Sequence, residues 1–306
     1  MIRSSGVFCL GLTPALQRTV VLDGWVPDGV NRAREVHESA AGKAVNTALA
    51  LANLGIRAVA AGFNGGETGR RLVRMVKAAG VEPAFTAMPA PTRICTTLID
   101  TRGGTVTEVV EEAPAVDATV SERFVRQGLR QIRKSVSVAI SGTLPPSVAA
   151  DYYLPFVKAA HAAGIPVLID SHRTPLLKVL PERPYLAKLN VHELALTLGK
   201  RMGSETAIRR GMKALQAAGA EQVFVTCGGD PAYLLTADGA FTRFEPPRLT
   251  RSLNPIGSGD CTLAGLLFAL LNGRCLEDAV CYGLACGTAN AETLLPAVFK
   301  PPAFKK

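Results

Sequence analysis

Short apolar runs alternate with longer helical patterns along most of this chain of 306 residues. The apolar runs predict strands at 7–12, 58–61, 136–141, 167–170, 186–190 and 223–226. Patterns with the helical period predict helices at 43–54, 70–79, 121–134, 149–163, 205–218, 260–271 and 276–291, with Ser121 as one N-cap. Strands and helices in alternation favour a mostly parallel sheet with helices on both faces. We therefore expect a doubly wound α/β fold, built as a single domain over residues 1–306.

Two segments depart from this alternation. Residues 19–38 have strand character around the turn Pro27-Asp28-Gly29, and residues 92–110 have it around a turn at 101–104. Two such β excursions could pair into a small sheet, formed by about 14–38 and 92–112, that covers one end of the main sheet as a lid. The alternative is two separate surface hairpins.

The charge and cysteine content exclude several functional classes. The formal net charge is +9, but the Lys and Arg residues are scattered, and no basic block of the kind that binds nucleic acid is present. The longest apolar run, 263–271, is too short to span a membrane. None of the seven cysteines forms a CxxC pair, and the four histidines have no metal-binding spacing. We expect a cytoplasmic protein with no nucleic-acid or membrane partner.

The run Gly257-Ser258-Gly259-Asp260 opens an apolar helical pattern. The N-terminus of a helix offers unpaired N–H groups and the positive end of the helix dipole, which together favour a phosphate. A carboxylate beside such a site suits a base that removes a proton from an attacking hydroxyl. The alternative is an Asp that caps a helix after a glycine turn.

Polar residues follow several of the predicted strands, namely Ser141, Asp170, Asn190 and Thr226 with Gly228. In a doubly wound sheet, ligands bind beyond the carboxyl ends of the strands. Asn190 and Glu193 lie three residues apart at a strand-to-helix junction and could orient water around Mg²⁺. The alternative is a capping box, and both interpretations can hold together.

Gly42 and Lys43, followed by Asn46, begin a predicted helix. A lysine in the first turn opposes the helix dipole, so a phosphate or sugar oxygen would explain it better than local stability does. Arg93, at the edge of the second excursion, could bind a substrate phosphate through its planar guanidinium. For both cations the alternative is an ordinary surface residue.

Six ordered motifs make the chain resemble the PfkB (ribokinase-like) family of carbohydrate kinases, and most closely its 1-phosphofructokinase and tagatose-6-phosphate kinase branch. The motifs lie at 41–46, 62–69, 91–94, 141–146, 188–193 and 254–260. The resemblance implies transfer of the ATP γ-phosphate to a sugar-phosphate hydroxyl, with ATP and Mg²⁺ required. It also implies a β lid that often forms a dimer interface.

The resemblance assigns roles residue by residue. It implies Asp260 as the base, with an anion hole at Gly257, Ser258 and Gly259. It implies substrate-side positions at Gln17, Gly42, Lys43, Asn46, Arg93 and Ser141. It implies ATP-side positions at Lys188, Asn190, Thr226, Gly228 and Asn290, with Glu193 and Asn190 holding Mg²⁺ through water.

The chain departs from the family pattern mainly on the substrate side. Gln17 stands where an Asp is usual, Ala41 and Ala44 replace glycines, and Pro231 replaces a glycine of the nucleotide loop. The acceptor is therefore left open among fructose-1-phosphate, tagatose-6-phosphate and fructose-6-phosphate. The alternatives are a kinase of an unphosphorylated sugar or nucleoside, or a non-catalytic ligand-binding homologue.

Overall fold

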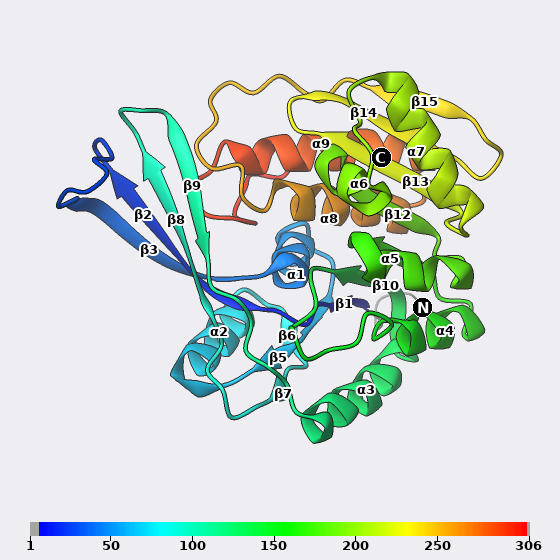
Figure 1. The fold of residues 1–306 in the computed structure, drawn as a ribbon, viewed down its shortest axis with the longest axis horizontal. Coiled ribbons are helices and arrows are strands. Elements are labelled where there is room, and N and C mark those ends of the chain that lie inside the picture. The colour runs from blue at the N-terminus through cyan, green and yellow to red at the C-terminus, as the bar shows by residue number, and fades with distance from the viewer. Residues whose placement is uncertain (1–5, 305–306) are drawn as a thin grey trace.

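A nine-stranded sheet forms the centre of the computed structural model, which describes residues 6–304 (Figure 1). Its strands, in spatial order, are β15 (Phe241–Phe244), β14 (Asp230–Leu235), β13 (Gln222–Cys227), β12 (Leu186–Asn190), β11 (Val167–Asp170), β10 (Ser135–Ser141), β1 (Gly6–Leu10), β4 (Ala58–Ala61) and β6 (Glu82–Pro83). The strands from β13 to β6 run parallel, and β14 and β15 are antiparallel additions at one edge. The predicted doubly wound sheet is confirmed.

Helices cover both faces of this sheet. One face carries α1 (Lys43–Asn53), α2 (Gly66–Ala78), α8 (Ser258–Leu271) and α9 (Leu276–Ala291). The other carries α3 (Ala118–Ile132), α4 (Leu154–Ala162), α5 (Arg173–Val179), a 3₁₀ turn at Leu180–Glu182, α6 (Val191–Leu198) and α7 (Glu205–Ala217). In β1, Val7 and Cys9 enter the first core while Phe8 and Leu10 enter the second. Alternate side chains of one strand are thus buried on opposite faces, which is why the parallel strands are continuous apolar runs.

The two β excursions pair with each other into one four-stranded sheet, which we call the lid. Its order is β3 (Ala33–Ala41), β2 (Ala15–Leu22), β8 (Ile94–Asp100) and β9 (Thr105–Val110). The central pair, β2 and β8, is parallel and joins the two excursions. Figure 1 shows the lid reaching away from the main sheet. The prediction of a paired lid is confirmed, and separate hairpins are excluded.

Several element boundaries and elements differ from the expectation. Asp117, and not Ser121, caps α3, because its side chain accepts the N–H of Val120. Helix α4 begins only at Leu154, and α2 begins earlier than expected, at Gly66. The antiparallel strands β14 and β15 and the small pair β5 (Phe63–Asn64) with β7 (Thr86–Ala87) were not predicted. None of the helices within residues 6–304 combines the length and the apolar character needed to cross a bilayer.

Candidate active site

The polar residues that follow the parallel strands meet at one edge of the sheet. The register pairs Ser141 with Asp170, Asp170 with Lys188, and Asn190 with Thr226. The N-termini of α1 and α8 lie against this edge, because Lys43 contacts Asp170 and Asn46 contacts Asp260. Residues far apart in sequence therefore form one polar cluster, as the strand-end pattern predicted.

Asp260 lies in the first turn of α8, only 5% exposed, and its carboxylate accepts a hydrogen bond of 2.8 Å from Nδ2 of Asn46. Burial raises the pKa of Asp260 from 3.8 to about 7, and the nearby carboxylate of Asp170 adds to the rise. Lys43, the Asn46 hydrogen bond and Lys188 oppose it. A carboxyl with a pKa close to neutral can exchange a proton with a substrate hydroxyl.

The loop before α8 is shaped to present backbone N–H groups. Gly257 has a φ of +81°, a backbone conformation that favours glycine. A Cβ at this position would also lie only 2.9 Å from Cβ of Pro296, so both the backbone conformation and the available space favour glycine. The N–H groups of Gly259 and Asp260 have no acceptor in the part of the chain that the structure describes. They form an open donor pair at the positive end of α8.

Asn290 holds this loop from behind. Its side chain, which is fully buried, donates to the carbonyl of Ile256 and to the hydroxyl of Ser258, and accepts from the N–H of Ala297. Cys261 makes a further contact with it at 3.3 Å. Asn290 is fully buried in the structure, where it holds the loop before α8, and its expected contact with ATP stays a prediction.

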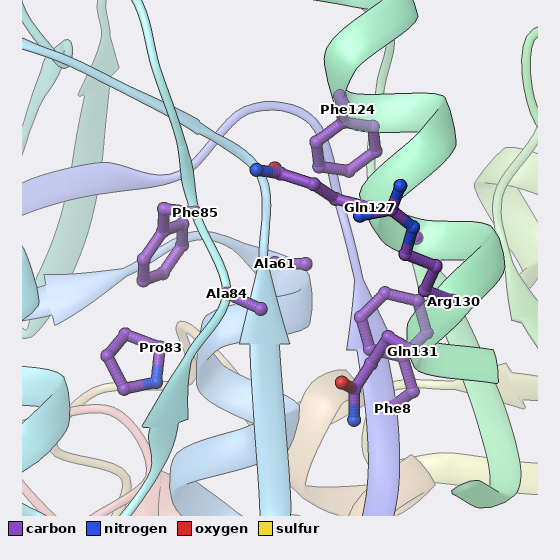
Figure 2. Close-up of a pocket in the computed structure, with 10 residues that line it drawn as sticks. Phe8, Ala61, Pro83, Ala84, Phe85, Phe124, Gln127, Arg130 and Gln131 are labelled. Carbon is purple, nitrogen blue, oxygen red and sulfur yellow. The ribbon is translucent and has the colours of Figure 1, made fainter. Parts of the chain in front are cut away.

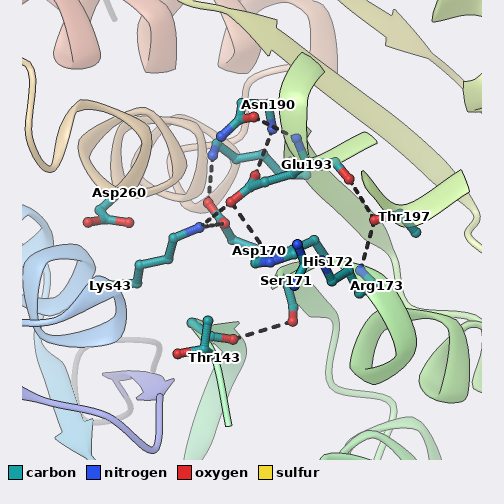
Figure 3. Close-up of polar contacts among 12 residues, drawn as sticks. Lys43, Thr143, Asp170, Ser171, His172, Arg173, Asn190, Glu193, Thr197 and Asp260 are labelled. Carbon is teal, nitrogen blue, oxygen red and sulfur yellow. Dashed lines mark hydrogen bonds and ion pairs between the residues drawn. The ribbon is translucent and has the colours of Figure 1, made fainter. Parts of the chain in front are cut away.

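Two lysines and two carboxylates form a charged cluster beside Asp260 (Figure 3). Nζ of Lys43 lies 2.8 Å from Oδ1 of Asp170 and 2.7 Å from Oε1 of Glu193, while Nζ of Lys188 lies 2.5 Å from Oδ2 of Asp170. Burial alone would lower the pKa of Lys43, but Asp170 and Glu193 outweigh burial and raise it. Burial would raise the pKa of Asp170, and the two lysines hold it below its usual range. Lys43 and Asp170 are therefore both charged at neutral pH.

Asp170 lies at the centre of this cluster, although sequence reasoning gave it no role. Its position after β11 is a visible signal, but nothing in the sequence indicates that one buried carboxylate pairs with lysines 127 and 18 residues away.

Asn190 and Glu193 form the capping box that was one of the two expectations. The Asn190 side chain accepts the N–H of Glu193, and Oε2 of Glu193 accepts the N–H of Asn190. The other Glu193 oxygen faces Lys43. Within residues 6–304, no three His, Cys, Asp or Glu side chains converge on a metal position. Each side-chain oxygen of Asp170 and Glu193 accepts a hydrogen bond from a lysine or from the N–H of Asn190.

Several residues expected on the substrate side carry unused polar atoms. Oδ1 of Asn46 and the hydroxyl of Ser141 are buried without a hydrogen-bond partner among the described residues, and Nε of Arg93 is in the same state. The terminal nitrogens of Arg93 donate to the carbonyls of Thr13 and Glu111, so its guanidinium is partly used by the backbone.

Two departures from the family pattern, Gln17 and Ala44, make defined contacts in the structure. Nε2 of Gln17 donates to the hydroxyl of Thr97 across the lid, which leaves the amide oxygen as its remaining acceptor. Ala44 is buried, and its Cβ lies against the bare Cα of Gly11, where a Cβ would be only 2.6 Å away. Ala44 thus packs against the residue that follows β1.

A cavity of about 190 Å³ joins the anion-hole loop to the end of β13, with Thr226, Gly228, Ser258 and Gly259 among its lining residues. The residues expected on the ATP side therefore lie in two places. Thr226 and Gly228 line this cavity, whereas Lys188 lies in the charged cluster. A Cβ on Gly259 would be 3.3 Å from Nζ of Lys188, so the lysine reaches the anion-hole loop.

A larger cavity, of about 340 Å³, lies away from this site between α3 and the segment after β6 (Figure 2). Phe85, Gln127 and Arg130 line it, together with buried side chains of β1 and β4. None of the residues expected to be functional contacts it, so its size does not make it the active site.

The pfkB family carbohydrate kinase model matches residues 5–298. The chain belongs to this family of carbohydrate kinases, and it is a sugar kinase. Among solved structures, the tetrameric inhibited form of phosphofructokinase-2 from Escherichia coli is 25% identical, with a TM-score of 0.86 and 94% of each chain covered.

Two further structures show the same fold. A protein named possible 1-phosphofructokinase from Thermotoga maritima is 22% identical, with a TM-score of 0.87, and covers 96% of this kinase and 94% of its own chain. Ribokinase from Arabidopsis thaliana, complexed with ribose and ATP, is 16% identical, with a TM-score of 0.75 and coverage of 96% and 95%. The suspected family and the ribokinase-like fold are confirmed.

Proposed function

We propose that this kinase transfers the γ-phosphate of ATP to a hydroxyl of a phosphorylated ketohexose, with Asp260 as the base. The observation that carries the proposal is the pairing of a buried carboxyl, its pKa raised to about 7, with the open N–H groups of Gly259 and Asp260. Phosphoryl transfer to an alcohol needs a base near the hydroxyl and donors aimed at the moving phosphoryl group.

Each side chain has one task in this mechanism. Asn46 orients the carboxylate of Asp260, which takes the proton of the acceptor hydroxyl as the hydroxyl attacks. The first-turn N–H groups of α8 stabilise the charge on the transferring phosphoryl group, and Lys188 adds a cation beside them. Thr226 and Gly228 line the neighbouring cavity, where we place the nucleotide.

Mg²⁺ would neutralise phosphate charge when it is bound with ATP. We assign its protein contacts to Glu193 and, beyond the expected pair, to Asp170. Asn190 supports Glu193 through the capping box, because its own side-chain oxygen is already used.

The basic residues at the substrate side favour an acceptor that already carries a phosphate. Lys43 and Ser141 line one narrow space, and the Ser141 hydroxyl is buried without a hydrogen-bond partner among the described residues. Oδ1 of Asn46 and Nε of Arg93 are unpartnered in the same way. Gln17, with one free acceptor oxygen, would select among sugar hydroxyls.

The test is ATP-dependent release of ADP, measured with Mg²⁺ against fructose-1-phosphate, fructose-6-phosphate, tagatose-6-phosphate, ribose, fructose and a nucleoside. We expect turnover on one ketohexose phosphate, reduced by about a hundredfold to ten-thousandfold in Asp260→Asn. Turnover only on an unphosphorylated acceptor would replace the proposed substrate class. An unchanged rate in Asp260→Asn would remove the residue from the mechanism.

We also propose that the lid forms a homodimer. Val36 and Val109, on one face of the lid, are 47% and 55% exposed. Val20 and Leu98 lie between them on that face, since Val20 pairs with both Val36 and Leu98. Exposed apolar side chains that form one surface are typical of protein interfaces.

A further inference from the structure

Lys43 joins the two halves of the active site in the structure. It is the first residue of α1, beside the substrate-side groups, yet its ammonium group lies between Asp170 at the end of β11 and Glu193 in the first turn of α6. Both contacts are shorter than 3 Å, and they span 127 and 150 residues of sequence (Figure 3). The ammonium group therefore neutralises the two carboxylates that we assign to the metal.

The two carboxylates depend on Lys43 to different degrees. Asp170 has a second cation, Lys188, on its other oxygen at 2.5 Å. Glu193 has no second lysine or arginine among the described residues, and its other neighbour, His172, is 3.7 Å away. If Lys43 moved away, one oxygen of each carboxylate would lose its close cation at the same time. An uncompensated pair of partly buried carboxylates is costly, so another cation would bind there.

Binding of an acceptor at the substrate side would require the Lys43 side chain to move. The space lined by Gly11, Thr13, Gly42, Lys43 and Ser141 is too narrow for a water molecule, so a ligand enters there only if part of this lining moves. The Lys43 side chain is 34% exposed, whereas Asp170 is 1% exposed, so only the lysine has open space into which it could turn. An anionic group of the acceptor would compete for the same ammonium group.

We propose that Lys43 exchanges partners on acceptor binding. In the free enzyme it occupies the metal carboxylates; when a phosphorylated acceptor binds, it turns to the acceptor's anionic group and releases Asp170 and Glu193 to a hydrated divalent cation. This inference rests on the proposed function for the identity of the acceptor. It makes the metal site weak until the acceptor is present, so ATP is not held for transfer to water.

Such an exchange couples the two ligands, and the coupling is reciprocal. Mn²⁺ is the probe, and its binding to nucleotide-free enzyme is measured from the spin-resonance signal of free Mn²⁺. For the wild type we expect weak binding that fructose-6-phosphate strengthens by about tenfold, a typical size for coupled sites. Lys43→Met should bind Mn²⁺ about tenfold more tightly without sugar, and the sugar phosphate should no longer change this affinity.

Matched variants separate this effect from a general change in charge. Lys158→Met removes one positive charge at an exposed site next to Glu182 and should leave Mn²⁺ binding as in the wild type. Lys43→Arg keeps the cation and should keep binding weak, and Glu193→Gln should weaken Mn²⁺ binding in the Lys43→Met background.

Equal Mn²⁺ affinity in the wild type and Lys43→Met would overturn the proposal. If Lys43→Met does not fold, the proposal is tested on the wild type alone. A wild-type Mn²⁺ affinity that the sugar phosphate leaves unchanged would then count against the exchange. Inorganic phosphate replaces the sugar phosphate as a second anion in the same Mn²⁺ measurement. The comparison of Mn²⁺ affinity between the wild type and Lys43→Met uses no sugar, so it does not depend on the identity of the acceptor. If only the proposed acceptor is wrong, the two affinities still differ; if the exchange is wrong, they are equal.

Discussion

Asp260→Asn should make the protein more stable while it removes activity. The substitution keeps the shape of the side chain and an oxygen that can accept from Asn46, but it removes a carboxyl that is 5% exposed. Burial raises the pKa of this carboxyl to about 7 in the folded protein, from 3.8. A difference of about three between the two pKa values corresponds to about 4 kcal/mol.

The sign of the pH dependence follows from which state binds the proton more tightly. Between about pH 4 and pH 7 the folded protein holds a proton on Asp260 that the unfolded chain releases. The free energy of unfolding of the wild type therefore falls as the pH rises through this window, relative to Asp260→Asn. The gap should widen by up to about 1.4 kcal/mol per pH unit and become constant above the folded-state pKa.

Urea unfolding followed by circular dichroism at several pH values between 4 and 8.5 measures this gap. Asp151→Asn, which removes an exposed carboxyl, is the control and should show no comparable widening. Parallel stability curves for the wild type and Asp260→Asn would refute the reasoning. In the same pH range kcat/KM of the wild type should rise as Asp260 loses its proton at about pH 7.

Three further substitutions test other parts of the site and the lid. Gly257→Ala, at a φ of +81° and with Pro296 in the way, should destabilise the fold by about 1–3 kcal/mol and lower kcat, measured by thermal unfolding and turnover. Val36→Glu should shift the protein towards the monomer in sedimentation, whereas Leu177→Glu, at an exposed residue outside the lid, should not. Gln17→Asp should lower KM for the sugar more than it changes kcat, since it replaces a half-used amide with two acceptor oxygens, and an unchanged KM would place Gln17 outside the substrate contact.

The parallel core of the fold could be predicted because both faces of its strands are buried. Strand β1, whose residues are all buried, is therefore a plain apolar run. Strand β14 was missed because Pro231 is unfavourable within a strand, and in the structure it lies at the second residue of an antiparallel strand near the sheet edge. Strands of two residues, such as β5, carry no periodicity to detect. Helix α4 starts late because Pro155 is favoured in the first turn of a helix.

The site was predicted where local sequence determines local geometry, and not where charges pair across the fold. The run from Gly257 to Asp260 predicts a helix N-terminus suited to an anion, and the structure places N–H groups without acceptors there. The capping box of Asn190 and Glu193 is likewise local. The bond from Lys43 to Asp170, in contrast, depends on the register of distant elements, which no short motif encodes.

In the proposed mechanism, two electrostatic features of one cluster oppose catalysis in the free enzyme. Near neutral pH a proton resides on Asp260 in part of the molecules, because burial raises its pKa to about 7 and the charge of Asp170 adds to the effect. Lys43 lowers that pKa, but its ammonium group is bound to Asp170 and Glu193, not to Asp260. If the phosphate of the acceptor drew Lys43 from these carboxylates and a divalent cation took its place, the charges of the phosphate and the cation would offset each other around Asp260. The pKa of Asp260 would then stay close to its value in the free enzyme, so the exchange would prepare the metal site without changing the ionisation of the base.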